Sequence, residues 1–493
     1  MSPLASRPTA FAPARWGVFS FNRLLPVFLI ALFFGGCGPS HHHYLLVETS
    51  LRANDFQGAD AAVQRAENEY GSKSRVLYGM DRGMTLHLAG EYQQSNQVLE
   101  VADEEVEKLY TRTVRTETLG FMTNDNALPY EGDPYEQIMI NVVKALNYAM
   151  LGLWQDALVE ARRIDHRLNV LNDRVKDKGD YREDGFARYL SGILYESTGD
   201  INNAFIAYRK AHETFDSTKG WLRTPAPVQL QADLLRASDA LHLDQEFTGY
   251  QRAFPNVTWQ SVRAQQQLAQ VVVMSYNGRA PRKEDQFLDL PISLDALQLV
   301  LLNRGIQQSN RRQNRVGDSI LYGLNGRVAR VALPKLISQK TQVPVDTVTL
   351  VPDNGNPISV RTEMVQNVTA LADKALSERL PGITVKALAR AAVKFTLAEG
   401  ATRGSQQAAG KDAAPWVGLA VGLLTHGLAI ASEEADKRSW RTLPDEIHLA
   451  RLWVPPGRYQ VPGVGWTGKG AQGARTLELG AGETAFLIQR VLP

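Results

Sequence analysis

From Tyr44 to about Pro255 the apolar residues recur at helical spacing, and one arrangement appears several times. Its small residues stand where two antiparallel helices would come into close contact, and a glycine ends the first helix in a left-handed conformation. The clearest unit runs Gly192-x2-Tyr195-x3-Gly199-Asp200-x3-Ala204-x3-Tyr208-x2-Ala211. Similar units begin at Ala145 and Gly83, and a weaker one ends at Ala66. The pattern predicts consecutive pairs of antiparallel helices.

One small position sets the register of these units, and it is occupied in turn by Ala59, Ser95, Ala157 and Ala204. With the turn residues, the pattern resembles the tetratricopeptide repeat (TPR), which implies an array of stacked helix pairs. The intervals of 36, 62 and 47 residues depart from the regular spacing of about 34, so we expect an interrupted array. The main insertion covers about 103–132, and Asp133-Pro-Tyr-Glu136 after it predicts a helix start.

After Pro255 the pattern changes to short strands mixed with helices. Residues 270–276 end in Asn277-Gly278, which is typical of a strand followed by a turn, and 318–333 and 345–351 are also strand-like. Residues 361–400 predict two helices broken at Pro381-Gly382. Strands at 446–454 and 458–461, and two more around Gly480-Ala481-Gly482, predict a small antiparallel β-module.

The expected fold class is therefore mainly α. A TPR-like array of helical repeats at 44–255 precedes a mixed α/β region with Ala/Gly-rich helices at 256–440, and a small antiparallel β-module at 441–493 ends the chain. Within the mixed region, Trp416–Ser432 has seventeen residues without a formal charge. That length is at the lower limit for a membrane span, and three glycines and His426 weaken it further. We expect a buried helix there, with a membrane segment as the alternative.

The N-terminus has the three parts of a signal peptide. Residues 1–23 are basic without an acid, 24–34 form an apolar run of eleven, and Gly35-Gly36-Cys37 follows. As a helix, eleven residues extend only about 16 Å, well short of roughly 30 Å of hydrocarbon. The Phe-Gly-Gly-Cys run resembles a bacterial lipobox, although Phe34 stands where leucine is usual. We expect removal of 1–36 and acylation of Cys37. The alternative is a plain secretory signal with a chance cysteine.

Acylation would anchor the chain in a lipid bilayer, because two or three acyl chains suffice for stable attachment. Residues 37–43 then form a lipidated tether, and its three histidines favour a solvated spacer over a metal site. The residue after Cys37 is Gly38 rather than Asp. By resemblance to the sorting rule of bacterial lipoproteins, this implies the outer membrane, with the protein facing the periplasm.

Composition and motifs exclude several functions. Cys37 is the single cysteine, so neither an internal disulfide nor a cysteine-based metal site can form. Removing Arg7, Arg15 and Arg23 with the signal peptide takes the net charge from +2 to −1, which does not suit a nucleic-acid partner. The chain has no GxSxG, HExxH or P-loop, and its histidines are scattered. We therefore expect no catalytic residue, metal or cofactor, with a hydrolase assembled from distant residues as the remaining alternative.

Two blocks carry a wider resemblance. YEGDPYEQIMINVVKALNYAMLGLWQDALVEARRID (130–165) and EADKRSWRTLPDEIHLARLWVPPGRY (434–459) resemble an uncharacterised family of bacterial TPR outer-membrane lipoproteins. The resemblance implies an envelope lipoprotein, and an association with factors that control peptidoglycan synthesis.

The first helix of each repeat is expected to line a concave groove for a partner. The expected groove residues are Met80, Met84, His87, Met139, Val142, Leu146, Met150, Phe186, Tyr189, Ile193 and Glu196. Four of the chain's eight methionines fall on this surface, and methionine suits surfaces that adapt to an apolar helix or an extended segment. In the alternative, the insertion or the C-terminal half folds over these residues and buries them as core.

The function expected from these features is a membrane-anchored, non-enzymatic scaffold or adaptor that binds another envelope protein through its repeats. Two alternatives stay open. One is a periplasmic regulator of peptidoglycan synthesis, and the other is a component of an export or surface-polymer apparatus.

Overall fold

The computed structural model describes residues 42–120, 126, 128–174, 183–292, 327–340, 347–408, 434–468 and 474–492. The chain divides into two units, 1–40 and 41–493, and the described residues belong to the second. The predicted signal peptide, Cys37 and the apolar segment Trp416–Ser432 lie outside the described residues.

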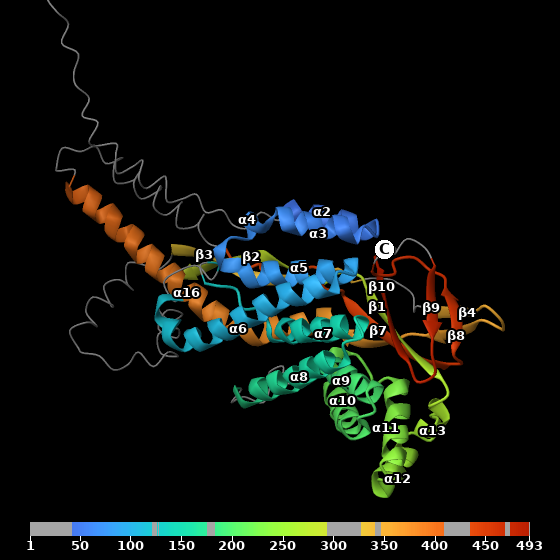
Figure 1. Ribbon diagram of the computed structural model, residues 1–493. Helices are drawn as coiled ribbons and strands as arrows, with labels where there is room; N and C mark the ends of the chain where they lie inside the picture. Colours follow the sequence, from blue (N-terminus) through green and yellow to red (C-terminus); the bar gives the residue numbers. More distant parts are fainter. Residues whose placement is uncertain are drawn as a thin grey trace, which may run out of the picture. The chain divides into compact units, whose positions relative to one another are not determined.

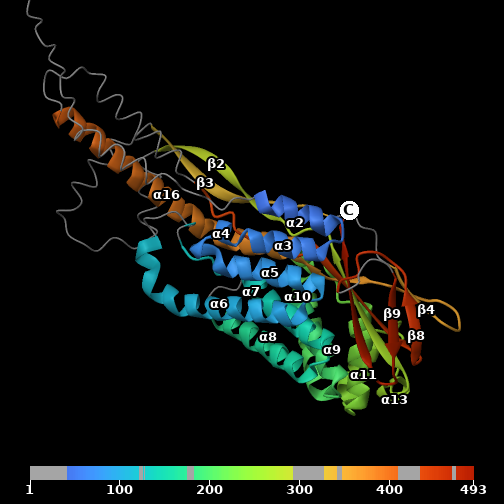
Figure 2. The ribbon, with the colours of Figure 1, turned by 45° about the horizontal axis from the view of Figure 1, so that its top comes forward.

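Helix pairs make up the first part of the described chain and follow one another in chain order, from α2 and α3 to α11 and α12 (Figures 1 and 2). The pairs are α2 (His42–Arg52) with α3 (Phe56–Arg65), α5 (Arg75–Ala89) with α6 (Tyr92–Gly120), α7 (Pro134–Met150) with α8 (Trp154–Arg174), α9 (Gly185–Ser197) with α10 (Ile201–Leu222), and α11 (Val228–Ala240) with α12 (Asp244–Ala253). Short helices α4 (Glu67–Tyr70), η2 (Ser72–Ser74) and α13 (Val262–Gln265) connect or follow them. The TPR-like array is confirmed, and its last pair had no match in the sequence pattern.

The predicted register of the repeats is confirmed by packing. The small residues at the shared position, Ala59, Ser95, Ala157 and Ala204, are fully buried. The turns within these pairs contain Asn54, Gly90, Gly152 and Gly199, and all four have positive φ angles. A Cβ atom on Gly192 would fall 2.3 Å from the Tyr208 ring, so only glycine allows α9 and α10 to approach this closely.

Two predicted boundaries in the array differ from the structure. The insertion expected at 103–132 is largely a continuation of α6, which is 29 residues long. The predicted start at Asp133 is confirmed, because the Glu136 carboxylate accepts a hydrogen bond from the Asp133 N–H at 2.8 Å in a capping box. The expected tether extends too far, because α2 begins at His42 and buries His43 against Tyr70, with ring centroids 4.8 Å apart.

The C-terminal half forms two four-stranded sheets and a separate ribbon. The central sheet has the order β10-β1-β7-β6 and the outer sheet the order β5-β4-β8-β9. The central strands are β1 (Ala269–Asn277), β6 (Glu363–Asn367), β7 (Glu446–Val454) and β10 (Thr484–Val491). The outer strands are β4 (Thr347–Pro352), β5 (Ile358–Arg361), β8 (Gly457–Val461) and β9 (Arg475–Leu479), and β2 (Arg282–Ile292) pairs with β3 (Arg327–Ile337) in the ribbon.

The strands predicted for the tail are present, but they do not form a module of their own. β7 and β10 flank β1 in the central sheet, and β10 pairs with β1 in parallel. β8 and β9 instead join β4 and β5 in the outer sheet. The reason is burial, because β1 is apolar on both faces and needs a neighbour on each edge and a layer on each side.

The helices predicted on either side of Pro381 are one helix, α16 (Val368–Ala408). An internal proline costs about 3 kcal/mol because it removes a backbone hydrogen bond. Packing on both sides of Pro381 offsets this cost. Leu371 and Ala375 are buried before it in the core shared with the repeats, and Ala387 is buried after it against β3.

The central sheet lies between the repeats and the outer sheet (Figure 1). Along β1, Val272, Met274 and Tyr276 join the core of the repeats, whereas the alternate residues Val271 and Val273 join the core with the outer sheet. The repeats and the C-terminal half therefore share one apolar core.

We expect Ala157→Leu and Ala204→Leu each to lower the free energy of unfolding by about 1–3 kcal/mol, because both positions are fully buried between paired helices. Gln155 is exposed beside Ala157, and Gln155→Leu should change stability by no more than about 0.5 kcal/mol. Chemical denaturation followed by circular dichroism measures both effects. Equal tolerance at the two kinds of position would show that the register is wrong.

Candidate functional site

The residues predicted to line a partner groove do come together on the inner helices of the array. Nine of them are buried: Met80, Met84, His87, Met139, Val142, Leu146, Phe186, Tyr189 and Ile193. Met150 and Glu196 are partly exposed. As an open groove the prediction is therefore wrong, and the alternative, in which the C-terminal half covers these residues, describes the structure.

Two parts of the C-terminal half cover the groove. One is the central sheet, whose Tyr276 lies against His87 with ring centroids 5.9 Å apart. The other is the segment 434–445 that leads into β7, in which Trp440 and Leu443 are buried in the shared core. We call the covered surface the filled groove.

Asp81 anchors the 434–445 segment at the first end of the filled groove. Its carboxylate accepts hydrogen bonds from the hydroxyls of Tyr44 at 2.6 Å, Tyr70 at 2.9 Å and Thr442 at 2.9 Å. Burial raises the pKa of Asp81, and these hydroxyls partly oppose that rise. Burial and the Asp81 charge raise the pKa of both tyrosines, so both remain neutral donors.

The capping box of α7 forms the second contact. Glu136 accepts hydrogen bonds from the Trp440 N–H at 2.8 Å and the Tyr130 hydroxyl at 2.5 Å. Asp133 pairs with Lys283 of β2 at 2.9 Å and with Arg379 of α16. Burial alone would raise the pKa of Asp133, but the two cations more than offset it and lower the pKa. The motif that starts the helix thus also holds three segments of the C-terminal half.

A buried ionic network closes the far end of the filled groove. The Arg451 guanidinium on β7 contacts Glu196 at 2.7 Å and Asp233 at 2.5 Å. Arg236 contacts the same two carboxylates, each at 2.7 Å. Both guanidinium groups also lie over the Trp453 ring, 4.9 and 4.8 Å from its centroid. We call these five side chains the arginine network.

The arginine network is electrostatically matched. Burial would raise the pKa of Glu196, but Arg236 and Arg451 outweigh it and hold the pKa well below its ordinary value. The sequence predicted Glu196 as a groove residue and missed its partners. The sequence does contain a signal for Arg451. It stands at the next inward-facing position of β7 after the apolar residues Ile447 and Leu449.

The polar interior of the filled groove also contains a buried histidine. His87 donates from Nδ1 to Asn147 at 2.6 Å, and burial lowers the pKa of His87 to about 4, so its imidazole is neutral at pH 7. Within the described ranges, no group of three or more His, Cys, Asp or Glu side chains is placed to hold a metal ion. None of the helices in those ranges has the length and apolar character that crossing a membrane requires.

A surface hollow of about 360 Å³ lies where the α7–α8 turn and the end of α9 meet β10. Met150, Trp154 and Phe486 give it an apolar lining. On the same turn, Leu151 is 40% and Leu153 47% exposed, so two neighbouring leucines add apolar surface beside the hollow. We call this hollow with its two leucines the β10 hollow.

Comparison with known proteins gives distant structural neighbours and no family. No family model and no curated protein matches the chain. Among solved structures, MamA 41-end from Desulfovibrio magneticus RS-1 is 12% identical, with 44% of this chain and 90% of that chain covered and a TM-score of 0.27. The apo form of RapI is 11% identical, with coverage of 47% and 58% and a TM-score of 0.31.

A third neighbour, described as Podosopora anserina putative kinesin light chain nearly identical TPR-like repeats, is 14% identical, with coverage of 44% and 93% and a TM-score of 0.27. Similarity this distant carries no function from these proteins to this chain.

We expect Arg451→Met to lower the free energy of unfolding by about 3–5 kcal/mol, because it leaves the buried charges of Asp233 and Glu196 undercompensated. The exposed Arg458 provides a matched control, and Arg458→Met should change stability by no more than about 0.5 kcal/mol. Urea denaturation at pH 7 measures the difference.

The difference in stability between wild type and Arg451→Met should depend on pH. Because the pKa of Glu196 is depressed in the folded protein, its stabilisation is complete above its ordinary pKa of 4.5 and is lost as the pH falls toward the folded value. The gap between wild type and Arg451→Met should therefore narrow below about pH 4.5. A gap independent of pH would contradict the ionic origin of the effect.

Proposed function

We propose that this protein is a lipid-anchored, non-enzymatic scaffold of the bacterial cell envelope, and that it binds another envelope protein at the β10 hollow. The observation that carries the proposal is this hollow, a site with apolar and polar lining on the outside of an array whose groove is occupied by its own chain. The repeats then act as a frame that presents the β-structure, and the partner binds beside β10.

The backbone of β10 supports a protein as the occupant. β10 is an edge strand of the central sheet. On its outer edge, the Thr467 N–H donates to the Ile488 carbonyl at 2.9 Å, and the Arg490 N–H donates to the Gly465 carbonyl at 2.7 Å. Since alternate residues of a strand face the same edge, Thr484 and Phe486 present their backbone groups there too, beside the hollow.

An extended segment of the partner would fit this arrangement. Its backbone would pair with the part of β10 beside the hollow, and an apolar side chain would lie in the hollow against Met150 and the contacting rings of Trp154 and Phe486. The exposed Leu151 and Leu153 would be covered in the complex. This mode of binding needs no catalytic group.

The anchoring part of the proposal rests on Cys37 and its preceding apolar run. The described residues start at His42, five residues after Cys37. Five residues span at most about 18 Å, so an acylated chain would work close to the membrane surface, and we propose the periplasmic side of the outer membrane. A partner in the same membrane would be within its reach.

We expect Cys37→Ala to abolish metabolic labelling with a palmitate analogue, because the thiol is the proposed site of acylation. The variant should also be released from the membrane fraction or remain uncleaved. Labelling that persists in Cys37→Ala would refute the lipid anchor while leaving the partner site untouched.

We expect the double substitution Leu151→Asp with Leu153→Asp to abolish crosslinking of the partner to a photoreactive residue introduced at Ser197, which lines the hollow. Both leucines are exposed, so circular dichroism should show an unchanged fold. The matched control is Val101→Asp, at a 68% exposed apolar residue on α6, and it should keep the crosslink. A folded double variant that still forms the crosslink in intact cells would refute the β10 hollow as the binding site.

A further inference from the structure

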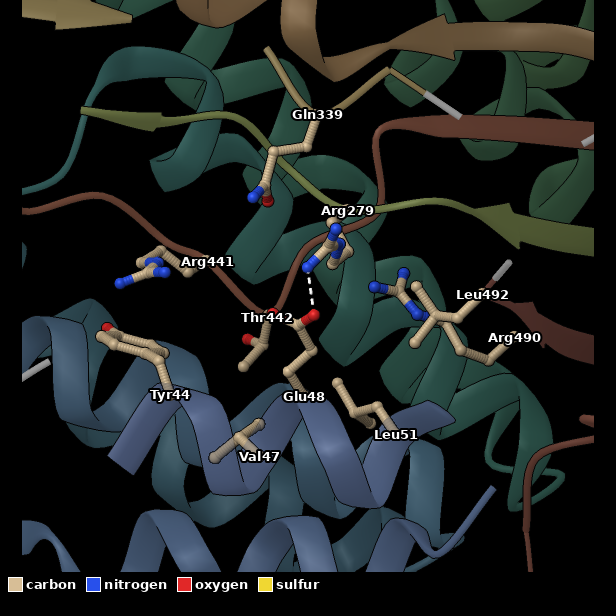
Figure 3. Close-up of a pocket in the computed structure, with 10 residues that line it drawn as sticks. All are labelled: Tyr44, Val47, Glu48, Leu51, Arg279, Gln339, Arg441, Thr442, Arg490 and Leu492. Atoms are coloured by element: carbon tan, nitrogen blue, oxygen red, sulfur yellow. Dashed lines mark ion pairs between the residues drawn. The ribbon is translucent and has the colours of Figure 1, made fainter. Parts of the chain in front are cut away.

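A small pocket lies between α2 and the segments that flank the central sheet. Its walls carry three arginines: Arg279 after β1, Arg441 before β7, and Arg490 near the end of β10. Val47, Glu48 and Leu51 of α2 form its floor, and Gln339 lies across from them (Figure 3). We call it the arginine pocket. It is separate from both the arginine network and the β10 hollow.

Arg490 is the unusual member of the pocket. Its side chain is only 2% exposed, yet Nε and Nη1 have no hydrogen-bond partner among the described residues. Nη2 donates a single long hydrogen bond, 3.4 Å, to the Leu443 carbonyl. No carboxylate of the described chain pairs with it. A buried guanidinium left without a counter-charge is costly, so its position calls for a ligand.

The other charged side chains of the pocket add to the excess of positive charge around Arg490. In Figure 3 the guanidinium group of Arg279 is turned toward Glu48 on α2, and that of Arg490 extends into the same pocket. Glu48 forms an ion pair with Arg279, and both are about one quarter exposed at the rim. Arg441 lies over the Tyr44 ring, 4.1 Å from its centroid. Three cations and one carboxylate leave two positive charges, and burial together with Arg279 lowers the pKa of Arg490 to about 9.

We propose that the arginine pocket binds a phosphate group in its dianionic form, held between Arg490 and Arg279. Guanidinium groups bind phosphate oxygens through paired hydrogen bonds, and the two free nitrogens of Arg490 are the donors this requires. A phosphate monoester carries about −1.5 to −2 charges at pH 7, which balances the excess in the pocket. A carboxylate or a phosphodiester supplies only one negative charge.

The size of the pocket limits the ligand to the phosphate end of a molecule. The cavity volume is about 30 Å³. A single water needs roughly 10–15 Å³ on the same measure, so the space admits two or three oxygens of one phosphate group and a nucleoside or a sugar ring does not enter. Because Arg279 and Glu48 at the rim are partly exposed, the remainder of a larger ligand would lie outside.

Two sources supply this chemistry, a soluble phosphate and a lipid headgroup with a terminal phosphate. The test uses the full chain as cells produce it, purified in detergent and transferred into phosphate-free buffer. Inorganic phosphate is titrated at constant ionic strength, with Tm and calorimetric Kd as readouts. Dihexanoyl phosphatidic acid, a monoester, and dihexanoyl phosphatidylglycerol, a diester, are the soluble lipid probes. Stronger binding of the short-chain phosphatidic acid than of inorganic phosphate assigns the site to a headgroup, and the reverse order assigns it to a soluble phosphate.

Inorganic phosphate should raise Tm with saturation, and Arg490→Gln should weaken binding by about tenfold or more, the loss expected for a charge-assisted hydrogen-bonded pair. Arg279→Gln should also weaken it, whereas Arg361→Gln, at an exposed arginine on β5 outside the pocket, should not. In phosphate-free buffer, Arg490→Gln should be at least as stable as wild type, because it removes an unpaired buried charge.

The proposal would be overturned by a wild-type Tm that responds to phosphate no more than to chloride, or by a tighter Kd for the diester than for the monoester. If Arg490 has only a structural role, Arg490→Gln should be less stable than wild type in phosphate-free buffer. In that case Arg279→Gln should bind phosphate with the wild-type affinity. If Arg490→Gln does not fold, the affinities of Arg279→Gln and Arg361→Gln decide the question. None of these readouts depends on the lipid anchor or on a partner at the β10 hollow.

Discussion

Strand β1 is the constraint on which the rest of the structure depends. Its nine residues are buried throughout, so neither face can be exposed to water. One face needs an apolar layer, which the inner helices of the repeats supply, and the other needs a second sheet. The repeats have the matching problem, since Met80, Met84 and Met139 would be exposed on an open array. Each half of the chain therefore solves the burial problem of the other.

This mutual burial explains why charged residues occur deep in the interior. Where a sheet meets a row of helix ends and turns, backbone and side-chain polar groups are buried with the apolar ones and must be paired. Asp81, Glu136 and Asp233 each meet this need with a partner from the C-terminal half. Replacing either partner alone leaves a buried charge or donor, so these contacts fix which segment covers which repeat.

The sequence predicted the features that depend on neighbouring residues. Small residues and turn glycines located the helix pairs, Asp133 and Glu136 located the start of α7, and the alternation at 446–454 located β7. The sequence did not predict which distant segments pair with one another. The parallel pairing of β1 with β10 and the continuation of α16 through Pro381 both depend on packing that no local pattern encodes.

The same limit applies to the site. A TPR-like pattern predicts which residues face inward, and that prediction holds for the buried groove residues. It does not reveal whether the inward face meets solvent, because the cover is encoded some 200 residues later in the chain, in pairs such as His87 with Tyr276 and Glu196 with Arg451. The β10 hollow could not be predicted either, since it arises only where the α7–α8 turn meets β10.

Arg451 and Arg490 show how the structural role of a buried arginine depends on whether its charge is paired. Both are buried arginines of the central sheet that face the helices. Arg451 has two carboxylates within 2.7 Å. These ion pairs balance its charge and attach β7 to the repeats. Arg490 has a like-charged neighbour and two donors without a partner among the described residues, and its contribution to that attachment is one long hydrogen bond to the Leu443 carbonyl. Among the described residues Arg490 has no counter-charge, and this is the difference on which the proposed phosphate site rests.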